Sequence, residues 1–193
     1  MKTVSDDIFE RYADDYDRWF DEHQEEYLAE LSRIRHIFPP HDSRAVEIGV
    51  GSGRFAVPLG IRIGVEPSRA LCRMAHQRGI GVIRGRVEDL PIRTESCSSV
   101  LFVTIICFLD DPRTAFREIH RILSQEGFLV IAFIEREGKI HRKYLLGGGK
   151  GRFLSRARFY SQEEVCAFLS DTGFDVKKGD ARAGFCVIAA QKI

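Results

Sequence analysis

Three glycines at alternate positions are the residues of this chain best suited to bind a ligand. They lie in the segment AVEIGVGSGRF, which runs from residue 45 to residue 55 and places glycine at 49, 51 and 53. Missing side chains let the backbone approach a ligand closely, and a helix that begins just after them presents free N–H groups to it. The apolar run before the glycines and the helical pattern after them predict a strand–loop–helix unit that binds a nucleotide-type ligand.

Two charged residues in this segment indicate which kind of nucleotide it binds. A dinucleotide fingerprint, G-x-G-x-x-G, requires glycine at position 54, where this chain has Arg54. Glu47 stands two residues before the first glycine, and its carboxylate would repel a pyrophosphate in a partly dry cleft. The same carboxylate would attract a cationic ligand. The pattern therefore favours a positively charged ligand, with a tight turn in some other α/β protein as the alternative interpretation.

A second acid follows the glycines after one predicted strand. Residues 61–65 form this strand, which ends at Glu66, thirteen residues after Gly53 (66 − 53). An acid at the tip of a second strand can accept hydrogen bonds from both hydroxyls of a ribose. Ser68 is the predicted N-cap of the helix that follows. We therefore expect Glu66 to bind ribose, and a surface acid in a turn is the alternative.

The E-x-G-x-G-x-G loop resembles motif I of the class I S-adenosylmethionine-dependent methyltransferases. Residues 86–92, RVEDLPI, are similar to the G-D-A-E-x-L-P-F segment of the ubiquinone/menaquinone-type (methyltransferase type 11) branch, which acts on small molecules. The resemblance covers about residues 44–193 and implies S-adenosyl-L-methionine as the cofactor. The cofactor-binding residues that it implies are Tyr16, Glu47, Gly49, Gly51, Gly53, Glu66, Pro67, Val87, Glu88 and Thr104.

Arg86 is a departure from the pattern of that branch. It stands where the branch has an aspartate that accepts a hydrogen bond from the adenine amino group. Either Glu88 takes over this role or backbone atoms alone contact the base. We favour Glu88.

The order of the predicted elements indicates an α/β fold with a doubly wound, Rossmann-like sheet. Predicted strands at 81–85, 99–106 and 128–134 are separated by turns and helices, as in a parallel sheet. Asp111-Pro112 is typical of a helix start, and Ser161 with Glu164 has the sequence of a capping box. Two final strands, 174–178 and 185–190, complete a seven-stranded, mostly parallel sheet with helices on both faces. The resemblance implies that these two strands form a C-terminal antiparallel hairpin.

The composition limits the class of protein. A chain of 193 residues is long enough for one domain, and 29 Lys and Arg against 28 Asp and Glu give no net field that would attract nucleic acid or a membrane. Residues 1–7 lack an apolar signal region, and the apolar run 100–109 is too short to span a bilayer. Five cysteines without C-x-x-C spacing predict a reduced, cytoplasmic protein, and the scattered histidines predict no metal site. Separately, we expect a monomer or homodimer.

Charge is balanced over the whole chain but not locally. Residues 1–30 hold eleven acidic residues against three basic ones, and their aromatic residues recur at the spacing of one or two helices. The segment 138–160 holds seven basic residues, several glycines and no acid. Within a single methyltransferase domain, 1–193, we predict an N-terminal helical cap, 1–40, and a glycine-rich basic lid, 138–160. The two would close together partly by opposite charge, and a solvated loop is the alternative for the second.

The cap also contains a segment, residues 12–20, that resembles the Y-D-x-W/F segment of small-molecule methyltransferases. This resemblance implies that Tyr16 covers the methionine end of the cofactor and that Tyr12 or Trp19 borders the acceptor. An aromatic face near a sulfonium is favourable by about 0.5–2 kcal/mol through cation–π attraction.

The implied reaction is direct in-line displacement, because a sulfonium methyl is already activated and the protein has mainly to align the acceptor and exclude water. A general base helps only if the acceptor must lose a proton. Candidates near the carboxyl edge of the sheet are Glu135, His141 and Asp110, and each has a structural alternative as a surface or loop residue.

The segment after the fourth strand indicates the class of acceptor. Residues 104–108, TIICF, lack the N/D-P-P-Y/F motif of exocyclic-amine DNA methyltransferases. We therefore expect a small, partly hydrophobic molecule and not a nucleobase in duplex DNA. Two other functions remain open: a catalytically silent S-adenosylmethionine-binding module and, less favoured, an NAD(P)-dependent oxidoreductase.

Overall fold

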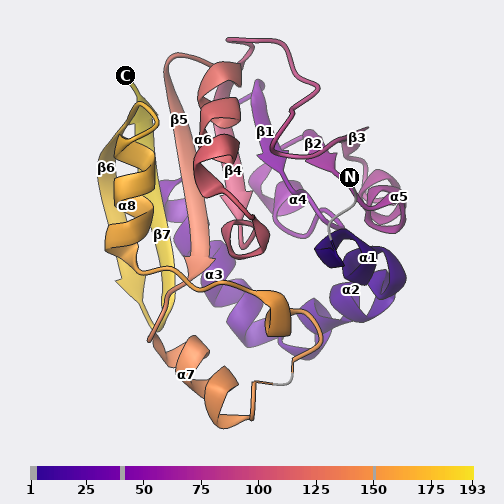
Figure 1. Cartoon of the computed structure of the whole chain (residues 1–193). Helices are drawn as coiled ribbons and strands as arrows, with labels where there is room; N and C mark the ends of the chain where they lie inside the picture. Colours follow the sequence, from indigo (N-terminus) through magenta and orange to yellow (C-terminus); the bar gives the residue numbers. More distant parts are fainter. Residues whose placement is uncertain (1–3, 40–41, 150) are drawn as a thin grey trace.

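The chain folds around one mixed β-sheet, shown in the computed structural model of Figure 1. The structure describes residues 4–39, 42–149 and 151–193. In these residues seven strands pair in the order β3-β2-β1-β4-β5-β7-β6. β1 to β5 are parallel, and β7 lies antiparallel between β5 and β6, which confirms the predicted doubly wound sheet and its C-terminal hairpin. The strands are β1 (Ala45–Ile48), β2 (Ile63–Glu66), β3 (Gly81–Arg84), β4 (Cys97–Val103), β5 (Leu123–Ile134), β6 (Phe174–Arg182) and β7 (Phe185–Lys192).

Helices cover both faces of this sheet. The α-helices are α1 (Val4–Arg11), α2 (Ala13–Glu22), α3 (Gln24–Ile37), α4 (Ala56–Leu59), α5 (Arg69–Gln77), α6 (Pro112–Ile122), α7 (Lys139–Leu146) and α8 (Gln162–Ser170). Two 3-10 turns, η1 (Ile106–Phe108) and η2 (Leu154–Arg156), lie in connections. Among the described residues, no helix has the length and apolar character needed to cross a membrane.

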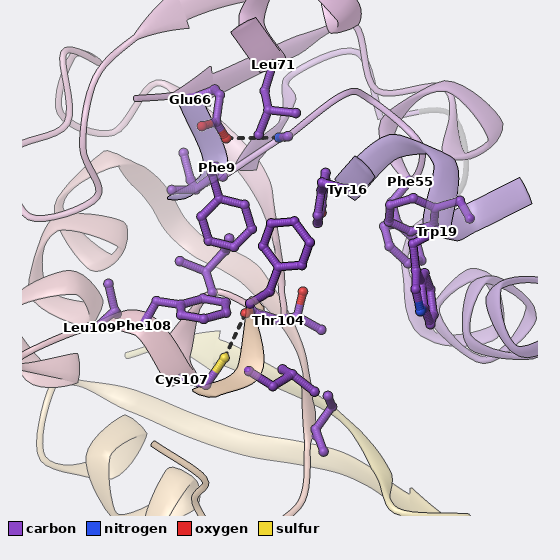
Figure 2. Close-up of a pocket in the computed structure, with 18 of the residues that line it drawn as sticks. Phe9, Tyr16, Trp19, Phe55, Glu66, Leu71, Thr104, Cys107, Phe108 and Leu109 are labelled. Atoms are coloured by element: carbon purple, nitrogen blue, oxygen red, sulfur yellow. Dashed lines mark hydrogen bonds between the residues drawn. The ribbon is translucent and has the colours of Figure 1, made fainter. Parts of the chain in front are cut away.

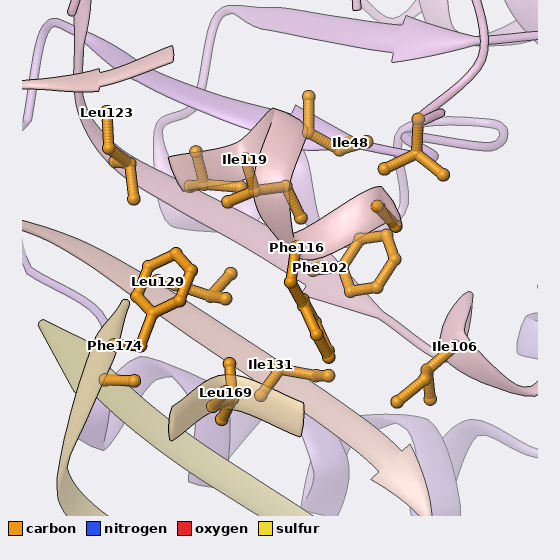
Figure 3. Packing of buried hydrophobic residues seen from close by; sticks show 14 of the residues in the cluster. Ile48, Phe102, Ile106, Phe116, Ile119, Leu123, Leu129, Ile131, Leu169 and Phe174 are labelled. Atoms are coloured by element: carbon orange, nitrogen blue, oxygen red, sulfur yellow. The ribbon is translucent and has the colours of Figure 1, made fainter. Parts of the chain in front are cut away.

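The core has two halves because successive side chains of a strand point to opposite faces of the sheet. On β4, Val100 and Phe102 pack with α6 and α8, whereas Leu101 and Val103 pack with the N-terminal helices and α5. Figure 3 shows the first half, where Phe116 of α6 meets Phe102. Their ring centroids are 6.3 Å apart. The parallel strands are thus buried from both sides, which holds their carboxyl ends in fixed positions.

The predicted helix starts are confirmed in atomic detail. Ser68 Oγ accepts a hydrogen bond from Leu71 N–H at 3.2 Å and caps α5. Asp111 caps α6, with Pro112 in its first turn. Ser161 and Glu164 form the reciprocal capping box of α8. Each cap pairs backbone donors that would otherwise be unsatisfied, so these starts follow from local sequence alone.

Several boundaries differ from the prediction. The aromatic pattern from Tyr12 to Ile34 lies on two helices, α2 and α3, in agreement with the prediction of one or two helices; α1 precedes them, and the backbone leaves the helical region at Tyr12 and His23. β4 ends at Val103 and not at 106, because Thr104 adopts a φ of 55°. β5 begins at Leu123, five residues before the predicted start, because the exposed residues Gln125 and Glu126 hide the strand pattern.

Candidate functional site

A cavity of about 570 Å³ opens at the carboxyl edge of the parallel strands (Figure 2). Gly49 follows β1, Glu66 ends β2 and Thr104 follows β4, and all three line the cavity. This is the edge at which doubly wound sheets bind ligands, and the volume suits a drug-sized molecule. The N-terminal helices, residues 85–88, residues 140–147 and residues 151–154 supply further parts of the wall.

The glycine loop has the backbone conformation that its residue types require. Gly49, Gly51 and Gly53 have φ values of 72°, 54° and 88°, which side-chain-bearing residues rarely adopt. A Cβ atom at Gly49 would lie 2.4 Å from Ile105 Cδ1, and one at Gly51 would lie 3.3 Å from the Tyr16 ring. Gly49 and Gly51 line the cavity, whereas Gly53 packs against α5. The glycines therefore also make room for the protein's own side chains.

Glu66 is held as a carboxylate at the cavity wall. Its side chain is buried, with Oε2 accepting a hydrogen bond from Gly51 N–H at 3.0 Å and Oε1 accepting one from Ser68 N–H at 2.9 Å. Backbone N–H donors favour the ionised form of an acid. Each carboxylate oxygen can accept further hydrogen bonds, so Glu66 can still bind two neighbouring hydroxyls. Pro67 lines the cavity beside it.

Glu47 lies beneath the glycine loop and outside the cavity wall. Its side chain is 1% exposed, and its Oε2 has no hydrogen-bond partner among the described residues. Burial raises the pKa of Glu47 well above its ordinary value, against a hydrogen bond from the Ala56 backbone, and nearby Glu66 raises it further. Glu47 can therefore influence a ligand through its electric field but does not contact the cavity.

The segment after β3 places three residues at the cavity. Arg86, Val87 and Glu88 all line it, and Arg86 Nη2 lies 3.0 Å from Glu88 Oε1. Arg86, which departs from the family pattern, therefore forms an ion pair with Glu88. Glu88 is the acid expected to replace the aspartate of that pattern. Val87 is buried and presents an apolar surface.

An aromatic cluster closes one side of the cavity. The Phe9 ring of α1 stacks on Phe153 at a centroid distance of 5.3 Å and meets Tyr16 and Phe108 edge-on at 5.4 and 5.1 Å. Figure 2 shows Phe9 between Glu66 and Phe108, with Tyr16 to one side. The sequence interpretation included Tyr16 and the apolar segment 104–108 that contains Phe108, but it missed Phe9 and Phe153. Phe9 lies three residues before Tyr12, so a longer reading of the aromatic pattern would have found it.

Asp17 of α2 ties the N-terminal helices to the glycine loop. Arg54 donates to Asp17 at 2.9 Å and to Asp21 at 2.7 Å, and Arg78 donates to Asp17 at 2.7 Å. Tyr27 Oη donates to the Arg54 carbonyl at 2.6 Å. Burial acts to raise the pKa of Asp17, but the hydrogen bonds from Arg54 and Arg78 outweigh it and hold the pKa far below its ordinary value. We call these residues the Asp17 clamp.

The basic segment contacts the acidic helices at one described ion pair. Arg152 pairs with Asp15, and its guanidinium carbon lies 4.0 Å from the centroid of the Tyr12 ring. The two oppositely charged segments therefore touch at this pair, and their closure as a lid stays a prediction. Arg142 and Lys143 form no ion pair among the residues that the structure describes. Residues 1–3 and 40 of the predicted cap and Lys150 of the predicted lid lie outside the described residues.

The three candidate bases lie away from the cavity wall. Glu135 N–H donates to the Gly184 carbonyl at 3.0 Å, and His141 Nδ1 accepts from Glu137 N–H at 2.9 Å. Asp110 is exposed, and its carbonyl accepts a hydrogen bond from Arg158. None of the three side chains is among those that line the cavity.

Cys107 does line the cavity, with Sγ 3.1 Å from the Thr104 carbonyl. Burial raises the pKa of this thiol to about 12, so it is neutral at pH 7.

A second group of acids lines the cavity from α3. Glu26 and Glu30 lie there together with Trp19 of α2. Burial raises the pKa of Glu30 to about 8, an effect that Arg33 opposes and Glu26 reinforces. The sequence interpretation did not single out Glu30. Its place in the helical repeat, four residues before buried Ile34, could have indicated it.

The chain is similar to known proteins along most of its length. Residues 46–131 match the family model described as "Methyltransferase domain". The uncharacterized protein MJ1123 of Methanocaldococcus jannaschii is 34% identical over 205 residues, which cover 96% of this chain and 99% of the relative. A crystal structure of an S-adenosylmethionine-dependent methyltransferase from Thermotoga maritima, described as a possible histamine N-methyltransferase, has a TM-score of 0.90 and 39% identity. The match covers 98% of this chain and 100% of that one.

A third comparison bears on the fold alone. The methyltransferase of Haloferax volcanii in complex with the activator Trm112 has a TM-score of 0.80 at 18% identity and covers 100% of this chain and 99% of its own. At that identity the likeness is one of architecture. It includes the whole length of the chain, N-terminal helices and C-terminal hairpin together.

Proposed function

This chain belongs to the S-adenosylmethionine-dependent methyltransferases, and from that membership we propose that it transfers a methyl group from S-adenosyl-L-methionine to a small-molecule acceptor by in-line displacement. The observation that carries the proposal is one continuous cavity. This cavity extends from Glu66 and the glycine loop to the aromatic cluster at the carboxyl edge of the sheet. One part suits a nucleoside and the other an apolar acceptor.

The residues present fit the cofactor. Glu66 would bind the ribose hydroxyls, Gly49 and Gly51 would lie against the methionine portion under Tyr16, and Val87 and Glu88 would contact the base. Burial favours the neutral form of Glu47 below the loop in the ligand-free protein, and a cationic ligand above the loop would favour its ionised form. When bound, S-adenosylmethionine supplies an activated methyl group.

The protein's own part is alignment and the exclusion of water. Phe9, Phe153 and Phe108 form a wall that removes solvent from the site, and Thr104 holds the end of β4 beside it. Alignment of two reactants can lower a barrier by about 7–11 kcal/mol. Thr104 has a φ of 55°, a strained conformation for a β-branched residue, and such strain is typical of functional positions. We propose no general base among Glu135, His141 and Asp110, because their side chains do not line the cavity.

A small acceptor is supported from two sides. The wall next to β4 is apolar, and the relative from Thermotoga maritima, at 39% identity over nearly the whole chain, is described as a possible histamine N-methyltransferase. A silent cofactor-binding module remains the second candidate function, because no previously predicted base reaches the cavity.

Calorimetric titration with S-adenosylhomocysteine, S-adenosylmethionine, NAD and NADP tests the cofactor. We expect the first two to bind, and Glu66→Ala to weaken binding at least tenfold, since charge-assisted hydrogen bonds contribute about 1.5–3 kcal/mol each. Glu163→Ala, which removes an exposed acid of α8, is the matched control. Binding of NAD in place of S-adenosylhomocysteine would contradict the proposal. Methyl transfer to a panel of small acceptors separates an enzyme from a silent module.

A further inference from the structure

The end of the cavity formed by α2 and α3 differs in chemistry from the end at Glu66. Trp19, Phe20 and Phe55 supply aromatic surface there, and Glu26 and Glu30 supply carboxylates. In Figure 2, Trp19 and Phe55 lie on one side of Tyr16, and Phe108 and Leu109 lie on the other. Glu66 and Leu71 are set apart from both groups. The α3 end is thus separate from the part that suits the cofactor.

Glu30 is the polar group at this end that lacks compensation. It lines the cavity, and it forms no hydrogen bond or ion pair with the described residues. The nearby cation, Arg33, is engaged elsewhere: its guanidinium donates to Asp180 at 3.2 Å and to the carbonyls of Asp180 and Arg182 at 2.7 and 2.8 Å. Glu30 is partly exposed, and an acid in a partly apolar site gains a charge-assisted hydrogen bond when a ligand supplies the opposite charge.

We propose that Glu30 binds a protonated amine of the methyl acceptor, so that this enzyme acts on small amines with an aromatic or apolar body. The inference rests on the proposed function, because it assigns the acceptor end of the same cavity. A carboxylate paired with an ammonium group gives a short, charge-assisted hydrogen bond. The faces of Trp19 and Phe20 add cation–π attraction and cover the apolar body of the ligand. A neutral or anionic molecule of the same shape would leave Glu30 without a partner.

Other charged or titratable groups also line the cavity. On the α3 side these are His23 and Glu26, and Glu26 reinforces the negative potential at Glu30. From the facing side, Lys143 and Tyr144 of α7 reach the cavity, and at the cofactor end there are Glu66, Arg86 and Glu88. Lys143 is exposed at the rim, where solvent screens its charge, so it does not neutralise a carboxylate deeper in the wall.

The pH dependence of amine binding gives a second readout. Burial raises the pKa of Glu30 to about 8, so the free protein carries this group largely protonated at pH 6. An alkylamine keeps its proton over this range, as lysine does with a pKa of about 10.4. Binding of the amine should therefore strengthen as pH rises from 6 to 8, because more Glu30 is ionised. A variant that lacks the carboxylate should lose this dependence.

The test is calorimetric titration of 2-phenylethylamine, 2-phenylethanol and 3-phenylpropionate into the full chain saturated with S-adenosylhomocysteine. We expect the amine to bind at least tenfold more tightly than the alcohol or the acid. Glu30→Gln should remove this preference and the pH dependence. Glu25→Gln, an exposed neighbour on the same helix that does not line the cavity, should keep both.

Each outcome separates this inference from the proposed function. If S-adenosylhomocysteine binds but the three probes bind equally, or the acid binds best, the assignment of Glu30 is wrong and the methyltransferase proposal stands. If S-adenosylhomocysteine itself fails to bind, the proposed function fails and the inference falls with it. Unchanged S-adenosylhomocysteine binding by Glu30→Gln verifies that the variant is folded, so that a lost amine preference is due to the carboxylate.

Discussion

At the scale of single residues, environment gives three acids different properties: Glu66 and Glu47 are buried, and Glu30 is partly exposed. Glu66 accepts two backbone N–H hydrogen bonds and is held ionised. Glu47 has one oxygen without a hydrogen-bond partner among the described residues, and burial raises its pKa well above the ordinary value. Glu30 lines the cavity with a pKa that burial raises to about 8. One side-chain type therefore has three proposed roles. Glu66 accepts hydrogen bonds from hydroxyls, Glu47 acts electrostatically from below the loop, and Glu30 binds a cation.

Replacement of Glu47 by glutamine should stabilise the ligand-free protein at neutral and alkaline pH. An acid whose pKa is raised in the folded state keeps its full stability below its unfolded pKa of about 4.3 and loses stability as pH rises from there toward its folded pKa. Between these two pKa values, the free energy of unfolding falls by about 1.4 kcal/mol for each unit by which the pH rises.

Urea unfolding of the wild type and Glu47→Gln at pH 5, 7 and 8 measures this effect. The stability difference should grow with pH in favour of the variant. Glu22→Gln, which removes an exposed acid from α2, should show no such trend. A difference that stays constant from pH 5 to 8 would contradict the raised pKa. Glu47→Gln should also bind S-adenosylmethionine less tightly, because glutamine cannot ionise in response to a cationic ligand.

At the scale of elements, the N-terminal helices are part of the site and not an addition to it. The Asp17 clamp ties α2 to the glycine loop through Arg54 and to the end of α5 through Arg78. Glu10 of α1 accepts hydrogen bonds from Ser68 Oγ at 2.8 Å and Ala70 N–H at 3.1 Å, at the start of α5. Arg54, which excludes a dinucleotide fingerprint, therefore has a positive structural role.

Asp17→Asn should destabilise the fold and weaken cofactor binding together. The change removes the charge that pairs with two arginines, and hydrogen bonds to charged groups contribute about 1.5–3 kcal/mol. The side chains are 17% to 30% exposed, so we expect a loss of about 1–3 kcal/mol in the free energy of unfolding. Denaturant unfolding checks it against Asp14→Asn, an exposed acid on the same helix. Equal effects of the two changes would show that the clamp contributes nothing.

The contact between the cap and the basic segment should be sensitive to salt. Arg152 and Asp15 are partly exposed, with side chains 48% and 39% accessible, and at 0.15 M salt the screening length is about 8 Å. We expect Arg152→Glu to weaken ligand binding several-fold at 50 mM salt and by less at 500 mM. Arg156→Glu, an exposed arginine of η2, is the control with the same change of charge. Affinities that do not depend on salt in either protein would rule out closure by opposite charge.

At the scale of the whole molecule, ligand binding should stabilise the complete fold. The cavity is lined from α1, α2, α3, the strand ends, residues 140–147 and residues 151–154, so a bound ligand connects elements from most of the chain. At one hundred times its Kd, a ligand that binds only the folded state stabilises it by about 2.7 kcal/mol. For a chain of 193 residues this corresponds to a rise in Tm of about 5–11 °C.

Differential scanning fluorimetry with S-adenosylhomocysteine measures that rise. Hydrogen exchange should show new protection in α1, α2 and residues 151–156, besides the glycine loop. A rise in Tm with protection confined to the glycine loop would mean that the aromatic cluster does not respond to the ligand.

The sequence by itself determined the architecture, the helix starts and the positions of the glycine loop and Glu66. These follow from local rules: strand and helix periodicity, side-chain caps, and glycine where φ is positive. It did not determine the breaks at Tyr12 and His23 or the end of β4 at Thr104, because no residue type there requires them.

Only the tertiary structure decided what surrounds the ligand. Phe9 and Phe153 are far apart in the chain, yet their rings stack at 5.3 Å, and Glu30 reaches the same cavity from α3. Arg86 meets Glu88, and the three candidate bases lie outside the cavity wall. These side-chain contacts depend on how whole helices and strands pack against one another. That packing is determined by burial and by shape complementarity. Local propensity carries no information on these contacts. Each side chain suits its own helix or loop equally well whether or not the contact forms.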